Sequence, residues 1–357
     1  MRLILICAIV SVKFGYAQDL FQNVEYGHYS VKHYSTVVTD PDRLWDDSLT
    51  INREVQIQVW YPFTNISNKG YQYQDYFKFI GTENKYRDHD NPIGYGEKVY
   101  FYPARYFKVS ENKLDSLKNF NMLASYSSTF PTGTTYPTIF FSQGASGRPI
   151  NNVPLFELLA SHGFVVVSYP SQAPNSNTSF VDNIPGGLKN QAVDLKMAYA
   201  YSIEHFPMVD KNNIHFAGIS SGTLAQYFLI KENNLNPKSV TSFDGSILSK
   251  SMEPFFDGYQ IPIFNCPVFV ANRYHEGVNF NILEKLTNQK TTTFFFTNLR
   301  HADFSSGPLL YRIVNNFYGP ANDGFIESYE YMISKWLYFI SNGAINNSVK
   351  IDSAYLH

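Results

Sequence analysis

The chain has 357 residues, of which 44% are hydrophobic and 16% are charged, and its formal net charge is −2. This composition is that of a packed globular protein, and it excludes a disordered chain and a basic nucleic-acid-binding protein. The length accommodates one large domain or two ordinary ones. Aromatic residues make up 17% of the chain, which we interpret as a large core, with an aromatic-walled ligand channel as the alternative.

The first 17 residues differ from the rest of the chain. Arg2 precedes an apolar run over residues 3–12, and Gly15-Tyr16-Ala17 places small residues where a signal peptidase cleaves. This pattern predicts a signal peptide at residues 1–17 and a secreted or periplasmic protein, because the run is too short to anchor the chain across a bilayer. Cys266 is then the only cysteine, and the apolar run that follows it predicts a buried side chain.

Two segments precede the main pattern of the chain. Residues 53–62 alternate apolar and polar side chains, which predicts a half-buried strand. Residues 64–136 are rich in Tyr, Asn and Lys and show no sustained period. We expect an inserted, loop-rich segment or cap there that covers a cleft, within a single domain over residues 18–357.

From Tyr136 onward, short β-branched and aromatic runs alternate with longer helix-compatible stretches. Strands are predicted at residues 138–142, 164–169, 214–219, 240–243, 268–271 and 291–297. Helices are predicted at residues 153–161, 188–205, 223–232 and 326–341. Because the strand runs are apolar throughout, they are typical of a mostly parallel sheet covered by helices on both faces. Such sheets bind ligands at the carboxyl ends of their strands.

The strongest local motif is Gly218-Ile219-Ser220-Ser221-Gly222, which lies between a predicted strand and a predicted helix. In that setting, G-x-S-x-G is typical of a nucleophile elbow, a sharp turn that presents the serine hydroxyl. The turn leaves no room for bulky residues two positions away, and both of those positions are glycine here. Ser220 is therefore the candidate nucleophile, and a Gly/Ser-rich turn without chemistry is the alternative.

A serine hydroxyl needs a neighbouring base to attack a carbonyl at neutral pH. His301 follows the last predicted strand, which fits the chain order serine, acid, histidine of the α/β-hydrolases. We therefore predict His301 as the general base. Among the nine histidines the main rival is His275, which lies in a loop after a predicted strand.

The remaining groups of such a site are a carboxylate and an oxyanion hole. Asp244 ends the strand after the elbow helix, and Glu276 follows the next strand, so position at a strand end leaves both open as the acid. The two oxyanion donors are predicted to be the backbone N–H groups of Ser221 and Ala145. The second of these lies in the loop Gln143-Gly-Ala-Ser-Gly after the strand at 138–142.

These motifs predict an α/β-hydrolase fold and a serine hydrolase that cleaves carboxylic esters through an acyl-enzyme. The sequence contains no HExxH motif, no paired Cys/His spacing and no Walker-type loop, so no metal or cofactor is expected. A peptidase or polyester hydrolase with the same triad stays open, as does a non-catalytic binding protein on a hydrolase scaffold.

Seven motifs together resemble the plasma-type platelet-activating factor acetylhydrolases and their bacterial relatives, within the wider dienelactone-hydrolase and cutinase-like group. They occur in the same order and cover nearly the whole mature chain. They are Gly27-His-Tyr-Ser-Val, Val59-Trp-Tyr-Pro, Tyr136-Pro-Thr-Ile-Phe-Phe-Ser-Gln-Gly, Leu159-Ala-Ser-His-Gly-Phe-Val-Val-Val, Gly218–Gly222, Ser242-Phe-Asp-Gly and His301-Ala-Asp-Phe.

The resemblance implies calcium-independent hydrolysis of esters with short acyl groups on lipids or small alcohols. It also implies that Asp244 is the acid, because the family carries this residue on the strand directly after the elbow helix, and it assigns an oxyanion donor to Ala145. The chain departs from the family at Gln143, where the family has His, at Ile219, where it also has His, and at Thr223, where it has Gly. The expected partner is a small-molecule or lipid ester. Contact with a membrane surface and the oligomeric state stay open.

Overall fold

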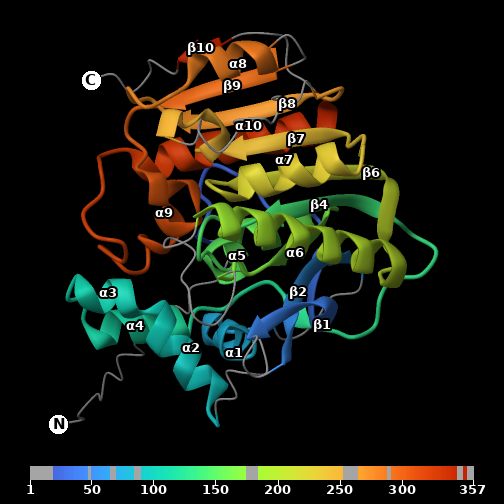
Figure 1. The fold of residues 1–357 in the computed structure, drawn as a ribbon. Coiled ribbons are helices and arrows are strands. Elements are labelled where there is room, and N and C mark those ends of the chain that lie inside the picture. Colours follow the sequence, from blue (N-terminus) through green and yellow to red (C-terminus); the bar gives the residue numbers. More distant parts are fainter. Residues whose placement is uncertain are drawn as a thin grey trace, which may run out of the picture.

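The computed structural model describes residues 19–46, 50–64, 70–83, 90–173, 184–251, 264–287, 291–343 and 349–351. The expected signal peptide lies outside these ranges. The described strands form one ten-stranded sheet in the order β10-β9-β8-β7-β6-β4-β5-β2-β1-β3 (Figure 1). The strands are β1 (Ser30–Asp46), β2 (Ile51–Phe63), β3 (Ser125–Tyr126), β4 (Tyr136–Ser142), β5 (Val165–Tyr169), β6 (Val209–Ile219), β7 (Ser239–Phe243), β8 (Val268–Arg273), β9 (Thr291–Phe296) and β10 (Val349–Ile351).

The seven strands from β10 to β5 in the sheet order are parallel, and β2 and β1 then add an antiparallel edge. The register brings Ser142 of β4 opposite Gly218 of β6, and Ile219 of β6 opposite Phe243 of β7. The carboxyl ends of these three central strands therefore meet at one edge of the sheet, where the loops that follow them lie side by side.

Helices cover the two faces of the sheet, and the apolar side chains divide between them. Ile139 and Phe141 of β4 belong to one core with α5 and α10, whereas Phe140 belongs to a second core with α6, α7 and α8. Figure 1 shows α6 and α7 on the near face. The helices that form these layers are α5 (Val153–Ser161), α6 (Ile184–His205), α7 (Gly222–Glu232), α8 (Phe280–Thr287), α9 (Gly307–Leu310) and α10 (Phe325–Asn342).

The strands and helices predicted after Tyr136 are all present, with ends that differ by a few residues. The sequence analysis missed β1, β3, β10, α8 and α9, which are short or lack a clear period. The sheet also begins earlier than expected, because β1 starts at Ser30 and places His33 inside it. The mostly parallel sheet with helices on both faces is confirmed.

The described part of the insertion predicted at residues 64–136 contains several short helices joined by turns. It is therefore more helical than the loop-rich segment that we expected. They are the 3₁₀ helix η2 (Tyr73–Tyr76), α1 (Phe77–Gly81), α2 (Pro92–Tyr100), α3 (Tyr102–Tyr106) and α4 (Glu111–Lys118). Helices of five to nine residues are too short for a 3.6-residue period to be visible in the sequence. Figure 1 shows these helices grouped beside α5 and the β1–β2 edge.

A buried carboxylate on α5 fixes this insertion. Glu157 accepts hydrogen bonds from the Tyr76 hydroxyl at 2.9 Å and from the backbone N–H groups of Leu123 and Ala124 at 2.8 and 3.1 Å. Burial raises the pKa of Glu157 to about 7, although the three donors counteract that rise. The insertion is therefore pinned at two separate points of its chain to a core helix.

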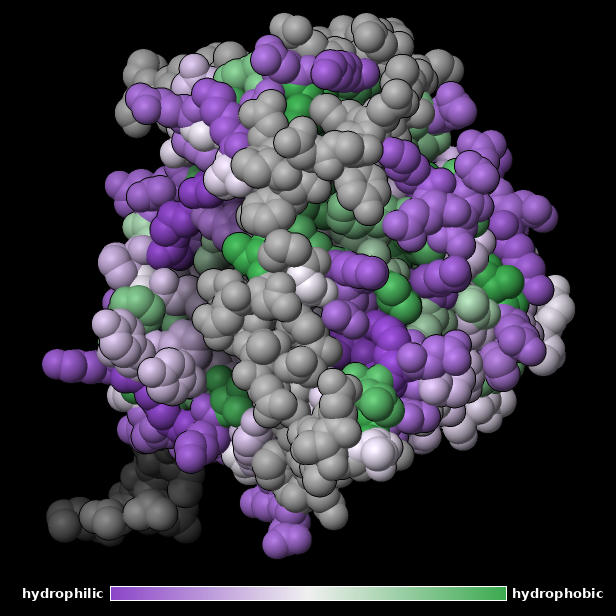
Figure 2. Space-filling model, viewed as in Figure 1, coloured by the Kyte–Doolittle hydropathy of each residue, from purple (hydrophilic) through white to green (hydrophobic). Residues whose placement is uncertain are grey.

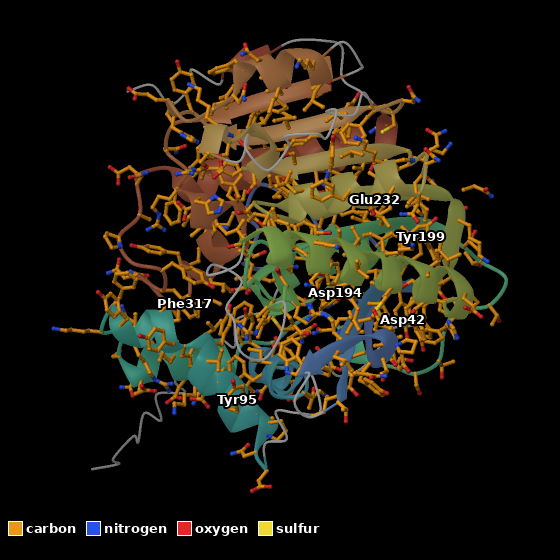
Figure 3. All side chains as sticks on the ribbon, in the orientation of Figure 1. Asp42, Tyr95, Asp194, Tyr199, Glu232 and Phe317 are labelled. Atoms are coloured by element: carbon orange, nitrogen blue, oxygen red, sulfur yellow. The ribbon has the colours of Figure 1, made fainter. Side chains whose placement is uncertain are left out.

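A second buried charge fixes α6. The Asp194 carboxylate accepts from Nε and Nη2 of Arg53, at 2.9 and 2.6 Å, and from Nη2 of Arg43 at 2.7 Å. The Arg53 and Asp194 side chains are 0% and 1% exposed. Figure 3 shows Asp194 on α6, facing the β1–β2 hairpin. The pair therefore ties α6 to the antiparallel edge of the sheet.

On the face shown in Figure 2, the described residues are mostly hydrophilic, with hydrophobic residues in small separate patches. Within the described part of the chain, no helix is both long enough and apolar enough to cross a bilayer.

Candidate active site

The serine motif forms a sharp turn between β6 and α7. Ser220 adopts a left-handed backbone conformation with φ of 53°, which is costly for a non-glycine residue and marks a strained turn. Its N–H donates to Phe243 O at 3.1 Å, and its carbonyl accepts from Thr223 N and Ser246 N. The hydrogen bonds on both sides of the Ser220 Cα hold the strained turn in place.

The two glycines of the motif are required by close backbone contacts. A Cβ on Gly218 would lie 2.8 Å from the carbonyl carbon of Gly222, and one on Gly222 would lie 2.3 Å from Ser142 O. Both distances are shorter than real side chains tolerate. The beginning of α7 thus packs directly on the end of β4, which orients the helix N-terminus beneath Ser220.

The structure brings Asp244 and His301 together from positions 57 residues apart in the chain. Asp244 Oδ2 accepts from His301 Nδ1 at 2.5 Å. Burial alone would raise the pKa of Asp244, but the hydrogen bonds and positive charges of His301 and Arg273 outweigh it and lower the pKa below its usual value. The carboxylate is therefore ionised at neutral pH and orients the imidazole.

Arg273, at the end of β8, contacts Asp244, which the sequence did not predict. Its Nε donates to Asp244 Oδ2 at 2.6 Å and its backbone N–H donates to Oδ1 at 3.0 Å. Its position could have indicated this contact, because Arg273 is the last residue of the strand that pairs with β7. The other candidate acid, Glu276, lies exposed on the surface, where its backbone carbonyl accepts from Lys250 Nζ at 2.8 Å.

The rival histidine, His275, lies exposed on the same side of the site as Arg273. Its Nδ1 accepts from Gly277 N at 3.1 Å. It lines a small cavity of about 200 Å³ together with Ser220, Asp244 and His301. Of the two histidines, His301 is the one whose ring contacts the buried carboxylate in the described part of the chain.

A capping arrangement fixes the turn that carries His301. The residue begins a short 3₁₀ helix, η7 (His301–Phe304). Asp303 accepts from the backbone N–H and the guanidinium of Arg300 at 2.7 to 2.9 Å. The segment after β9 is thus a well-defined turn, with the imidazole side chain 48% exposed toward the cleft.

The predicted oxyanion donors lie on either side of the serine. A Cβ built on Gly144 would lie 3.2 Å from Ser220 Cβ and 3.8 Å from its Oγ, so the turn that contains Ala145 passes directly over the hydroxyl. A bond from Gly147 N to Gly144 O at 2.8 Å closes this turn. Among the described residues, the backbone N–H groups of Ala145 and Ser221 have no protein acceptor.

Gln143, where the resembling family has His, anchors the same loop. Its amide donates to Ser168 Oγ at 2.9 Å and its amide oxygen accepts from Asn152 Nδ2 at 2.8 Å. The side chain is 1% exposed. Gln143 therefore fixes the loop that carries the Ala145 N–H through two buried hydrogen bonds.

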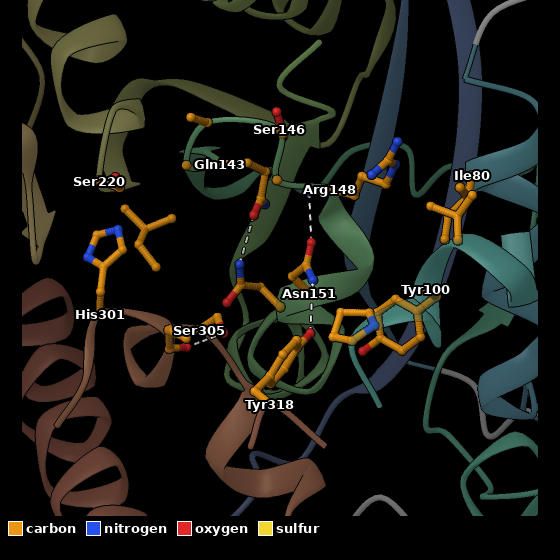
Figure 4. Close-up of a pocket in the computed structure, with 18 residues that line it drawn as sticks. Ile80, Tyr100, Gln143, Ser146, Arg148, Asn151, Ser220, His301, Ser305 and Tyr318 are labelled. Atoms are coloured by element: carbon orange, nitrogen blue, oxygen red, sulfur yellow. Dashed lines mark hydrogen bonds between the residues drawn. The ribbon is translucent and has the colours of Figure 1, made fainter. Parts of the chain in front are cut away.

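A cavity of about 500 Å³ extends from Ser220 and His301 to the insertion. Figure 4 shows Ser220 and His301 at one end, Ile80 and Tyr100 at the other, and the polar side chains Gln143, Asn151 and Tyr318 between them. Ile80, Val99, Tyr100 and Pro103 of the insertion form its apolar wall. The segment expected to cover a cleft thus contributes to the wall of this one.

Tyr100 is held in place by contacts with two other aromatic residues. Its hydroxyl lies 2.5 Å from that of Tyr73, and its ring packs against Phe317, with centroids 5.4 Å apart. Figure 3 shows Phe317 beside the α2–α3 region. The far wall of the cavity is therefore a packed part of the molecule.

Thiols and metal-binding clusters are the other two kinds of site to consider in the described residues. Cys266 is buried, and burial raises the pKa of its thiol to about 12, which suppresses the nucleophilic thiolate. The buried position predicted for it is confirmed. No group of three or more His, Cys, Asp or Glu side chains in the described ranges is arranged to hold a metal ion.

Comparison with known proteins gives structural but not sequence matches. No protein-family model and no curated protein matches the sequence. A ferulic acid esterase from Streptomyces cinnamoneus has a similar structure, with a TM-score of 0.62 at 15% identity, over 94% of this chain and 95% of that one.

Two peptidase structures are more distant. An acylaminoacyl peptidase from Pyrococcus horikoshii has a TM-score of 0.46 at 10% identity, over 90% of this chain and 44% of that one. A dipeptidyl aminopeptidase IV from Bacteroides ovatus has a TM-score of 0.44 at 10% identity, over 87% and 36%. The strand order and the likeness to the esterase structure show that this chain has the α/β-hydrolase fold.

Proposed function

We propose that this protein is a serine hydrolase of carboxylic esters, with Ser220 as nucleophile, His301 as general base and Asp244 as the orienting acid. The observation that carries the proposal is the buried Asp244 carboxylate bonded to His301 Nδ1 at 2.5 Å, beside a serine on a strained elbow. Nε2 of the same ring is then free to face the nucleophile. Ser220 and His301 line the same cavity, as a shared substrate requires.

In the first step, Ser220 Oγ forms a bond to the ester carbonyl carbon while His301 Nε2 takes the hydroxyl proton. The carbonyl π electrons move to the oxygen, which the N–H groups of Ala145 and Ser221 stabilise. When the tetrahedral intermediate collapses, the bond to the alcohol breaks and His301 returns the proton to it. Water, activated by His301, then hydrolyses the acyl-enzyme by the same steps.

The proposed substrates are short-chain or lipid-like esters. The cavity of about 500 Å³ has an apolar wall from the insertion and a polar floor, which suits a compact acyl or aromatic group better than a peptide chain. The similar structure with the TM-score of 0.62 is that of a ferulic acid esterase, which favours esters over amides. The resemblance to the acetylhydrolase family points the same way.

Location and partners are part of the same proposal. The signal-like pattern at residues 1–17 supports export to the periplasm or the medium. The partner is a small-molecule or lipid ester.

The first test compares wild type with Ser220→Ala on p-nitrophenyl acetate, butyrate and octanoate. We expect the wild type to hydrolyse the shorter esters and the variant to lose about 10⁴-fold or more in kcat. A fluorophosphonate probe should label the wild type at Ser220 and leave the variant unlabelled. A folded wild type that neither turns over these esters nor reacts with the probe would contradict the proposal and favour a binding scaffold.

A further inference from the structure

A glutamine on α6 connects the two loops that carry the proposed oxyanion donors. Gln191 Nε2 donates to Gln143 O at 2.5 Å, and Gln191 Oε1 accepts from Ser221 Oγ at 3.2 Å. Gln143 lies two residues before Ala145, and Ser221 carries the other donor. The Gln191 side chain therefore bridges both loops, although it is 48 residues from Gln143 and 30 residues from Ser221 in the chain.

The chemistry of the contacts fixes the orientation of this amide. A carbonyl oxygen can only accept, so the NH₂ group of Gln191 must face Gln143 O. The amide oxygen then faces Ser221, whose hydroxyl donates. Gln191, Gln143 and Ser221 are 0%, 1% and 5% exposed, so water does not compete for these bonds, and breaking one leaves a buried polar atom without a partner.

The helix that carries Gln191 is itself anchored. The Tyr169 hydroxyl donates to Gln191 O at 3.1 Å. Asp194, one turn further along α6, holds the buried Arg53 at 2.6 Å. A side chain mounted on such a rigid element can set a distance between two loops more accurately than contacts within the loops themselves.

We propose that Gln191 is a positioning residue that sets the spacing and direction of the Ala145 and Ser221 N–H groups. The inference rests on the proposed function, and it goes beyond the triad and the donors themselves. Oxyanion donors act at 2.7–3.1 Å from the developing charge, and a displacement of about 1 Å costs roughly a hundredfold in rate. Gln191 does not touch the reacting atoms and acts only through the two loops.

The decisive variant is Gln191→Met, which keeps the length of the side chain and removes both bonds. We expect kcat on p-nitrophenyl butyrate to fall about 10- to 100-fold while KM stays within about twofold. A trifluoromethyl ketone traps the tetrahedral state, because attack by Ser220 Oγ moves the carbonyl electrons onto oxygen as His301 takes the proton. Its inhibition constant should rise by the same factor as kcat/KM falls.

The matched control is Gln226→Met on α7. Gln226 is 1% exposed and its Nε2 donates to a backbone carbonyl, Thr241 O, at 2.8 Å, but among the described residues its amide makes no hydrogen bond to either loop. We expect this variant to lose thermal stability and to keep kcat and the inhibition constant within about twofold of wild type. The control separates the loss of a buried amide from the loss of loop positioning.

Ser221→Ala gives an independent test, because it removes the hydroxyl that bonds Gln191 and keeps the backbone N–H. We expect kcat to fall about fivefold or more, with KM unchanged. If Gln191→Met keeps kcat and ketone inhibition within twofold and loses only stability, the proposal is overturned. Should Gln191→Met fail to fold, an unchanged kcat in Ser221→Ala overturns it instead.

Fluorophosphonate labelling keeps this result separate from that of the proposed function. The labelling rate reports the same oxyanion stabilisation without any ester turnover. A wild type that is labelled but hydrolyses no ester contradicts the proposed substrate class, whereas slower labelling of Gln191→Met than of Gln226→Met still supports the positioning role.

Discussion

At the scale of single residues, Ser220 and Asp244 both adopt positive φ angles, of 53° and 39°. Such conformations cost about 1–3 kcal/mol each in non-glycine residues and persist only where surrounding contacts hold them. For Asp244 the contacts are the bond from its N–H to Ala271 O at 2.7 Å and the bonds from Arg273 to its carboxylate. Both of these residues take part in the proposed chemistry.

The choice between the two candidate acids can be tested with isosteric amides. Asp244→Asn should lower kcat by about 10⁴-fold, because the amide stabilises the wrong tautomer of His301 and does not stabilise its charged form. Glu276→Gln should stay within about twofold of wild type, because that side chain is exposed on the surface. Steady-state kinetics on p-nitrophenyl butyrate measure both. The reverse pattern would assign the acid to Glu276.

At the scale of elements, α6 links the antiparallel edge of the sheet to the loops around the serine. Near its beginning Gln191 contacts both loops, and one turn later Asp194 binds Arg53 of β2. Arg43 of β1 joins the same carboxylate at 2.7 Å. The helix therefore connects β1 and β2 to the loops of the candidate site.

Removing the charge of Asp194 should destabilise the whole protein. Asp194→Asn keeps the shape of the side chain but takes away the carboxylate charge that Arg53 and Arg43 share, and breaking such a buried pair costs roughly 3–5 kcal/mol. Urea unfolding should show that loss in the free energy of unfolding. The control is Asp115→Asn, which breaks an exposed pair with Lys118 and should cost less than about 1 kcal/mol. Equal effects in the two variants would contradict this account.

At the scale of the whole molecule, the β1–β2 edge and the insertion together enclose a histidine. His33 is 0% exposed and lies within 6 Å of the ring centroids of Trp60, Tyr71, Tyr76 and Phe79. Burial and the positive charge of Lys78 lower its pKa to about 3. The folded protein therefore holds the His33 imidazole in its neutral form at neutral pH.

This burial predicts a pH dependence of stability. The pKa of His33 is lowered in the folded state, so between pH 6.5 and about 3 the unfolded chain binds a proton that the folded protein does not. The free energy of unfolding is therefore unaffected by this group above pH 6.5 and decreases as the pH falls, by roughly 2 kcal/mol at pH 5. His33→Phe removes the titrating group. The unfolding free energy of the variant relative to wild type should rise by that amount between pH 7.5 and pH 5, and a constant difference would count against the mechanism.

The sequence alone determined those features that depend on neighbours in the chain. The apolar runs and their spacing predicted the parallel strands and the long helices after Tyr136, because strand and helix periods are local properties. The glycines at 218 and 222 predicted the elbow for the same reason, since the tight turn needs them within five residues. The short helices of the insertion fell below the length at which a period can be read.

The tertiary structure alone decided which distant residues meet. Position at a strand end did not distinguish Asp244 from Glu276, and only the fold shows that Asp244 contacts His301 whereas Glu276 is exposed on the surface. Arg273 and Gln191 carry no motif, because a single polar side chain gains its role only from partners brought close by packing. The far wall of the cavity, formed by Ile80 and Tyr100, depends on how the insertion docks on α5. These contacts join segments dozens to hundreds of residues apart in the chain, so a pattern of neighbouring residues cannot predict them.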